Sequence, residues 1–169
     1  MREFGSMGEF ATHLAGLAVG MYVHEQAALT RCLVLIQNTA QMEFGHYQSA
    51  TGPFPAWLEL AETTKERREA LGYTPNDPLL MSGQMRADSG HEVEGLEGVV
   101  GSHDPKMPYH EFGTMKIPAR PVWGPAALKN REKIEMLLGA AVVSGLIGSD
   151  PIHPALGYDF ATDEPAWVK

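Results

Sequence analysis

The sequence predicts an α+β fold, in which helices near both ends flank one pair of short strands. Apolar residues recur every three or four positions over residues 7–42, which is the period of an amphipathic helix. Residues 91–94 and 96–100 predict two antiparallel strands about a tight turn at Gly95. A second helical pattern covers residues 125–146. Together these observations indicate one mixed domain.

The N-terminal helical pattern consists of two apolar stripes. The first stripe contains Phe10, Leu14, Leu17 and Met21, and the second contains Leu29, Cys32, Leu33, Ile36 and Ala40. Gly16 and Gly20 weaken the first stripe, because each costs about 1 kcal/mol relative to alanine inside a helix. The pattern therefore predicts either two helices or one long helix with a bend near Gly20.

The middle of the chain predicts short elements separated by turns. Residues 45–55 form a proline- and glycine-containing loop. A short polar helix is expected over residues 64–71, with Thr63 or Thr64 as its cap and Gly72 at its end. A helical turn is expected at residues 79–81, after the turn residues 73–78. Loops are expected at residues 104–108, and an extended segment at residues 118–121, where two prolines disfavour helix.

The C-terminal part predicts a helix followed by an arm. Pro125 suits the first turn of the helix. The expected apolar face consists of Leu128, Ile134, Leu137, Leu138, Val142 and Leu146, opposite the polar residues Lys129, Arg131, Glu132, Lys133 and Glu135. We expect one domain over residues 1–148 and an extended C-terminal arm over residues 149–169. Aromatic residues spaced along this arm favour docking, either on another surface or back on its own domain. They are Tyr158, Phe160 and Trp167.

Composition excludes several kinds of protein. The net charge of −8 disfavours nucleic-acid binding through clustered cations, although DNA can pass along a negative wall without being held. Cys32 is the single cysteine, which excludes an internal disulfide and any zinc site with two thiolates from one chain. A place of synthesis in the cytoplasm fits this usage. Neither a signal peptide nor a membrane-spanning segment is expected.

The sequence predicts no catalytic site and no cofactor. His24-Glu25 begins like a metalloprotease helix, but Ala28 stands where the second histidine belongs. Cys32 lies on an apolar stripe, where a thiol is a poor nucleophile. No nucleophile elbow, phosphate loop or dinucleotide fingerprint occurs. We therefore expect a protein that is not an enzyme.

One group of side chains invites a metal-site interpretation. His103, Asp104, His110 and Glu111 are imidazoles and carboxylates within nine residues, which suit zinc or manganese. Their spacing matches no helix face and includes two prolines, so the sequence does not bring all four onto one ion. We expect no metal, and a metal-dependent hydrolase stays as an alternative.

Residues 109–121 carry a family resemblance. The run Tyr-His-Glu-Phe-Gly-Thr-Met-Lys-Ile-Pro-Ala-Arg-Pro, preceded by Gly101-Ser102, resembles the signature of the phage head–tail joining and tail-completion proteins of siphophages and Mu-like phages. Residues 56–64 resemble the Trp-x-x-Leu … Thr segment of that family, and residues 78–86 resemble its Ser/Thr-Gly-x-Leu-Arg segment. In this chain Val122-Trp123 replaces the usual aromatic residue after the second proline. The resemblance covers roughly residues 56–146.

The resemblance implies a structural role in a virion. It implies a small sheet packed on helices, in a subunit that assembles as a ring of six copies in the neck, at the upper end of the tail. Partners would be other copies of the chain, head-connector proteins and tail-tube proteins, with DNA passing through the lumen without specific binding. Such a ring needs a heterologous interface, in which two different faces meet. Assembly would take place in the host cytoplasm. A tail-assembly adaptor or chaperone that is absent from the virion is the other alternative.

We assign the interface and assembly residues mainly to the signature. They are Tyr109, His110, Glu111, Phe112, Gly113, Pro118, Arg120, Pro121 and Trp123, together with Trp57, Tyr158, Phe160 and Trp167. Gly113 permits a positive φ, and the prolines hold the next segment extended. Arg120 can bind a carboxylate or carbonyl groups, either in its own domain or in a neighbouring subunit. Trp57 and Trp123 can cover the edge of the core or lie at an interface.

Overall fold

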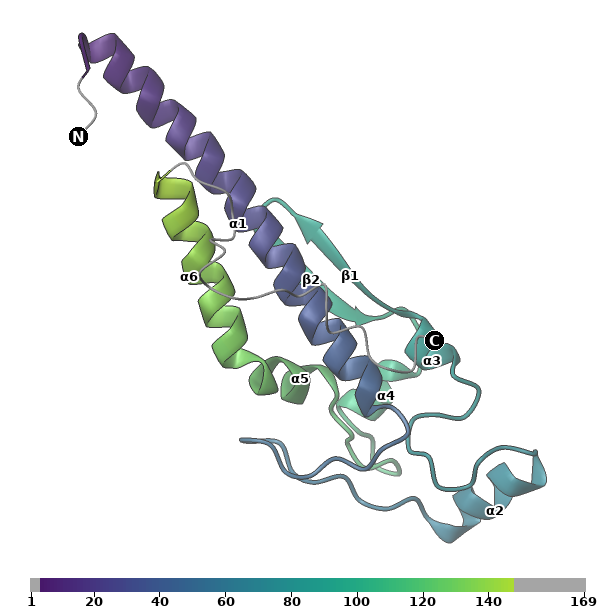
Figure 1. Ribbon diagram of the computed structural model, residues 1–169. Coiled ribbons are helices and arrows are strands. Elements are labelled where there is room, and N and C mark those ends of the chain that lie inside the picture. Colours follow the sequence, from purple (N-terminus) through teal and green to yellow (C-terminus); the bar gives the residue numbers. More distant parts are fainter. Residues whose placement is uncertain (1–3, 148–169) are drawn as a thin grey trace, which may run out of the picture. The chain divides into compact units, whose positions relative to one another are not determined.

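The computed structural model describes residues 4–147, and the fold is of the α+β class, as predicted. A long N-terminal helix, a two-stranded antiparallel sheet and a C-terminal helix are its main elements (Figure 1). In chain order they are α1 (Met7–Glu43), α2 (Glu62–Ala70), α3 (Gln84–Ala87), β1 (Ser89–Glu94), β2 (Glu97–Ser102), α4 (Met107–Glu111), α5 (Trp123–Lys129) and α6 (Arg131–Ile147). The predicted arm over residues 149–169 lies outside the described residues. No described helix is both long enough and apolar enough to cross a membrane.

The chain divides into two compact units. The central unit is Leu29–Glu135, and the helical unit contains, within the described part of the chain, residues 4–28 and 136–147. Both α1 and α6 contribute to each unit. The two units are described separately below.

The N-terminal pattern forms one helix rather than two. α1 runs without interruption through Gly16 and Gly20. A Cβ atom added at either glycine would meet nothing within 4 Å, so neither glycine marks a close contact. A single long helix is therefore confirmed, whereas the bend expected near Gly20 stays a prediction.

In the central unit the β-hairpin packs against α1. β1 and β2 pair with His91 opposite Val100, and Leu96 belongs to the turn rather than to the second strand. The Gln37 side chain on α1 donates to the Ser89 carbonyl oxygen at 3.1 Å and contacts His91 Nδ1 at 2.6 Å. A Cβ atom at Gly98 would lie 2.5 Å from Leu33 Cδ1, so the strand reaches the helix because glycine has no side chain there.

The core of the central unit joins segments that are far apart in the sequence. It combines the end of α1, two loops, α4 and α5, through Ala40, Phe44, Trp57, Leu79, Met107, Val122 and Ala126. Phe44 and Val122 are almost fully buried. Burial of apolar side chains of this size stabilises a fold by about 1.5–3 kcal/mol each. This core fixes where residues 109–121 begin and end.

The predicted short polar helix is present as α2, but three details of the short elements were predicted wrongly. α2 starts at Glu62, after Ala61, so neither Thr63 nor Thr64 caps it; it does end before Gly72 as expected. Leu79 has a positive φ of 59°, which excludes the predicted helical turn at residues 79–81. The expected loop at residues 107–108 is the first turn of α4. Proline is tolerated there because its missing N–H would have no helical partner.

The predicted helix over residues 125–146 is two helices, α5 and α6, separated at Asn130. The Asn130 side chain donates to the Ala126 carbonyl oxygen at 2.8 Å and to Thr39 Oγ1 on α1 at 2.7 Å. Asparagine side chains that bind nearby backbone compete with helical hydrogen bonds. Asn130 therefore both interrupts the helix and attaches it to α1.

In the helical unit α1 and α6 approach closely. A Cβ atom at Gly145 would lie 2.7 Å from both Cα and Cγ of Met21. Leu137 and Ala141 are buried, whereas Leu138, Val142 and Leu146 of the predicted apolar face stay exposed. Small residues and glycine thus provide part of the buried side of α6, and larger apolar residues lie outside it.

We predict that Gly145→Ala lowers the free energy of unfolding by about 1–3 kcal/mol, because the new methyl group overlaps the Met21 backbone. The control is Gly139→Ala, also in α6, where nothing lies within 4 Å of the added Cβ. This control should raise stability by about 0.4–1 kcal/mol. Urea unfolding of the full chain measures both changes. Equal effects of the two substitutions would contradict the close packing.

Candidate assembly surfaces

Residues 109–121 comprise the end of α4 and the loop that follows it, and they are named the braced loop here. They are attached to the core at several points. The first is Glu111, whose Oε2 accepts a hydrogen bond from the Val122 N–H at 2.8 Å, with further bonds from the N–H groups of Trp123 and Gly124. These N–H groups begin α5, where a carboxylate compensates for donors that have no helical partner. Burial raises the pKa of Glu111, and the three hydrogen bonds oppose that rise. Glu111 therefore acts as the cap of α5.

The second attachment is Arg120, which is only 4% exposed. Its Nη2 donates to the Leu58 carbonyl oxygen at 2.9 Å and to that of Glu59 at 3.4 Å. Its backbone N–H donates to the His110 carbonyl oxygen at 2.6 Å. Burial lowers the pKa of the guanidinium. Of the two alternatives for Arg120, the structure shows bonds within its own domain.

The third attachment is Trp57, which is buried in the core. Its Nε1 donates to the Pro121 carbonyl oxygen at 3.2 Å. Gly113 has the positive φ that was predicted, 74°, and a Cβ there would lie 2.8 Å from the Ala119 backbone nitrogen. The turn is closed by the Thr114 N–H, which donates to the Ile117 carbonyl oxygen at 2.8 Å. Both ends and the middle of the loop are thus held by specific contacts.

Large apolar side chains project from this fixed backbone. Tyr109 is 57% exposed, Phe112 is 82% exposed and Met115 is fully exposed. We name these three residues the apolar tip. Isolated apolar residues on a surface need no explanation, but three on one braced loop are typical of a contact surface.

The other predicted interface residues occupy different places. Pro118 is exposed; Trp57, Arg120 and Pro121 are buried; His110, Glu111, Gly113 and Trp123 are half-buried. The buried and half-buried residues hold the loop rather than offer a surface. Tyr158, Phe160 and Trp167 lie outside the described residues. The sequence pattern did not separate the residues that hold the loop from those that project.

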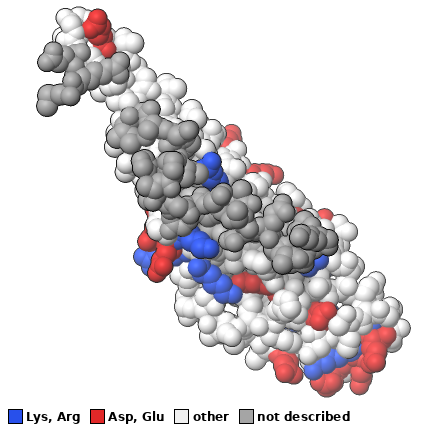
Figure 2. All heavy atoms as spheres, in the orientation of Figure 1, with Lys and Arg blue, Asp and Glu red and all other residues white. Residues whose placement is uncertain are grey.

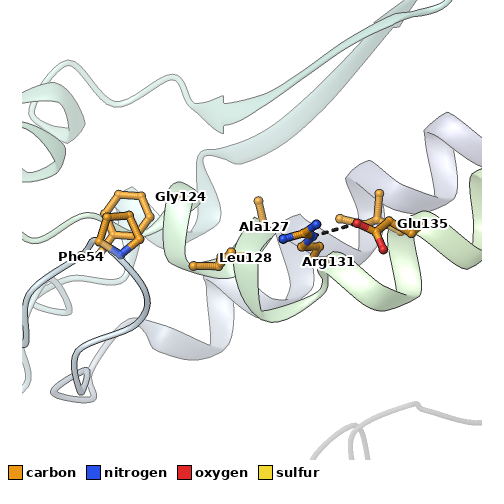
Figure 3. A pocket seen from close by; sticks show the side chains of 8 residues that line it. Phe54, Gly124, Ala127, Leu128, Arg131 and Glu135 are labelled. Carbon is orange, nitrogen blue, oxygen red and sulfur yellow. Dashed lines mark hydrogen bonds and ion pairs between the residues drawn. The ribbon is translucent and has the colours of Figure 1, made fainter.

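An apolar pocket of about 440 Å³ lies elsewhere in the central unit (Figure 3). It is formed by the loop around residues 53–54, α5 and the first turns of α6, and its walls are Pro53, Phe54, Gly124, Ala127, Leu128, Arg131, Ile134 and Glu135. The Phe54 ring lies against Gly124, where a Cβ would be 2.4 Å from Phe54 Cζ. Arg131 Nε donates to Glu135 Oε1 at 2.8 Å at one side of the pocket. Sequence analysis missed this pocket, because its loop and helices meet only in the folded chain.

The helical unit carries a second apolar surface, named the helical surface here. Ten of its large apolar side chains are 38–80% exposed, namely Met7, Phe10, Leu14, Val19, Tyr22, Val23, Leu138, Val142, Val143 and Leu146. Over residues 7–28 the only Asp, Glu, Lys or Arg residues are Glu9 and Glu25. Figure 2 shows few charged side chains on the visible part of this stretch of α1, whereas charges of both signs gather on α2. Part of the first predicted stripe, Phe10 and Leu14, therefore faces outward.

The candidate metal ligands do not form a site. Asp104 is buried and its Oδ1 accepts a hydrogen bond from the Lys106 N–H at 2.8 Å, while His103 is exposed and Glu111 caps α5. Within residues 4–147 no three His, Cys, Asp or Glu residues are grouped so that they could hold a metal ion. Cys32 is buried, and burial raises the pKa of its thiol. The geometry thus gives no support to the hydrolase alternative.

Comparison with known proteins adds no relative: no family model matches the sequence, and searches of curated proteins and of solved structures find no similar protein.

We predict that Arg120→Met lowers the free energy of unfolding by about 2 kcal/mol, because it removes the hydrogen bonds that the buried, charged guanidinium donates to the carbonyl groups of Leu58 and Glu59. Phe112→Ser should change stability by no more than about 0.5 kcal/mol, since the ring is exposed. Thermal and urea unfolding of both variants test this division between the brace and the tip. A tolerated Arg120→Met substitution would show that the loop is held by other contacts.

We also predict a pH effect at His110. Burial, followed by the nearby Arg120 charge, lowers the pKa of His110 from its ordinary value of 6.5, although Asp104 opposes the shift. Below that value the unfolded chain binds a proton that the folded chain does not, so this residue contributes a loss of stability as pH falls. The wild type should therefore lose more stability than His110→Gln between about pH 7.5 and about pH 5.5. Parallel stability curves for the two proteins would rule out this coupling.

Proposed function

We propose that this chain is a structural subunit of a tailed bacteriophage neck, a head–tail joining or tail-completion protein that assembles as a ring around the DNA channel. The observation that carries the assembly part of the proposal is the helical surface. Its ten large apolar side chains are 38–80% exposed, and they are distributed over α1 and α6. Extensive exposed apolar surface of this kind is typical of sites that contact another protein.

The size of the helical surface favours other protein subunits as its partner. A stable protein interface buries about 800 Å² on each side. The surface is formed by α1 and α6. Over residues 7–28 of α1 the only charged residues are Glu9 and Glu25, so the surface is suited to contact with equally apolar helices. Neighbouring copies of the same chain provide such helices.

The assignment to a phage neck is supported by the braced loop. The signature that resembles the head–tail joining family corresponds to a set of matched contacts, in which Glu111 caps α5, Arg120 binds two carbonyl groups and Gly113 adopts a positive φ. The net charge of −8 fits a channel that DNA passes without being retained. A role in the virion accounts for these features without an active site.

Purified full-length protein should form rings, seen by light scattering after size exclusion and by electron microscopy, and mass spectrometry should find the chain in mature virions. Val19→Glu combined with Val143→Glu should abolish ring formation, because both side chains lie on the helical surface and are 66% and 57% exposed. Val99→Glu is the matched control, since Val99 is 69% exposed on β2 in the central unit. This control should still form rings.

Two outcomes would contradict the proposal. A chain that stays monomeric at all concentrations and is absent from virions is not a neck subunit. A chain that assembles but is absent from mature particles acts instead as an adaptor or chaperone during tail assembly.

A further inference from the structure

We propose that the Phe112 side chain of one subunit inserts into the apolar pocket of the next subunit, and that the ring needs this heterologous contact in addition to the contacts of the helical surface. The inference rests on the proposed ring assembly and adds the two surfaces that meet. Both surfaces belong to the central unit, Leu29–Glu135, so each subunit carries one of each.

The pocket is not filled by the apolar tip of its own chain. Phe112 is 82% exposed and Met115 is fully exposed, and neither contributes to the pocket wall. The pocket is lined mainly by apolar side chains and is open to solvent. A tip that is open to solvent and an open apolar pocket on the same unit are therefore complementary in chemistry.

The pocket wall favours an aromatic occupant. Phe54 supplies a ring, Leu128 and Ile134 supply aliphatic walls, and Arg131 places a guanidinium at the edge, held by its ion pair with Glu135 (Figure 3). A guanidinium over an aromatic face contributes about 0.5–1 kcal/mol at exposed sites and more when water is excluded. Among the aromatic side chains in the described part of the chain, Phe112 is the most exposed.

The backbone that carries Phe112 is already fixed before any partner binds. Glu111 on one side of Phe112 caps α5, and Gly113 on the other side holds the tight turn. Little conformational freedom remains to be lost on binding, which favours affinity.

The two surfaces are different, which is the requirement for a ring. An interface that joins a tip to a pocket leaves a free pocket on one subunit and a free tip on the other, so further copies add until the ring closes. A two-fold dimer, in contrast, pairs identical surfaces and stops at two copies.

A mixing experiment with the full-length chain tests the inference. Phe112→Ser removes the tip and keeps the pocket, whereas Ile134→Asp damages the pocket and keeps the tip. Each variant alone should fail to form rings, with self-association weakened at least roughly tenfold. An equimolar mixture should form a one-to-one heterodimer, detected by native mass spectrometry, because one intact tip and one intact pocket remain. Formation of that heterodimer also shows that both variants are folded.

One further variant is a control, and a second tests the pocket edge. Leu71→Ser removes an apolar side chain that is 55% exposed at the end of α2 and should leave ring formation unchanged. Arg131→Ala removes the guanidinium from an exposed position and should weaken association without affecting folding.

Three outcomes would overturn the inference. Phe112→Ser could assemble like the wild type, the mixture could give no heterodimer, or deletion of residues 149–169 could abolish assembly while an added peptide of that sequence restores it. The last result would make the C-terminal segment the occupant of the pocket. If Phe112→Ser fails to assemble and the mixture gives the heterodimer, but the wild type is absent from virions, the contact stands and the proposed neck function fails.

Discussion

Two charged side chains, the buried Arg120 and the half-buried Glu111, organise the candidate site. They are not paired with each other. Arg120 donates to the carbonyl groups of residues 58–59, and Glu111 accepts from the first N–H groups of α5. Burying either charge is costly unless its hydrogen bonds are made, so the loop between them is strongly specified. Every exposed residue of the apolar tip depends on this constraint for its position.

The same constraint gives the exposed side chains of the braced loop defined positions. In an enzyme, buried charged groups usually line a cleft and face a substrate. Here they face backbone, and the side chains that project between them are Phe112 and Met115, which have no acid–base chemistry. The arrangement is suited to recognition between proteins, where rigid aromatic side chains lose little entropy on binding.

The helical unit follows a different principle. Its close contact is made by Gly145 against Met21, and larger residues such as Val19 and Val143 remain outside. The two helices therefore pack through small residues, and several of their large apolar side chains remain exposed to solvent. These exposed side chains support the proposed assembly, and the braced loop supports the kind of assembly that we propose.

The local sequence pattern by itself determined the α+β class and the hairpin around Gly95. It also predicted the positive φ of Gly113 and gave the single long N-terminal helix as one of two alternatives. These features follow from helical period, turn chemistry and glycine geometry, which act over a few residues. Only the tertiary structure decided that Asn130 interrupts the C-terminal helix, since its partner Thr39 is distant in sequence. It also decided that Arg120 and Trp57 hold the loop while Phe112 projects, and that Phe54 and Leu128 form a pocket. A sequence pattern gives spacing along one element, but burial depends on which elements meet.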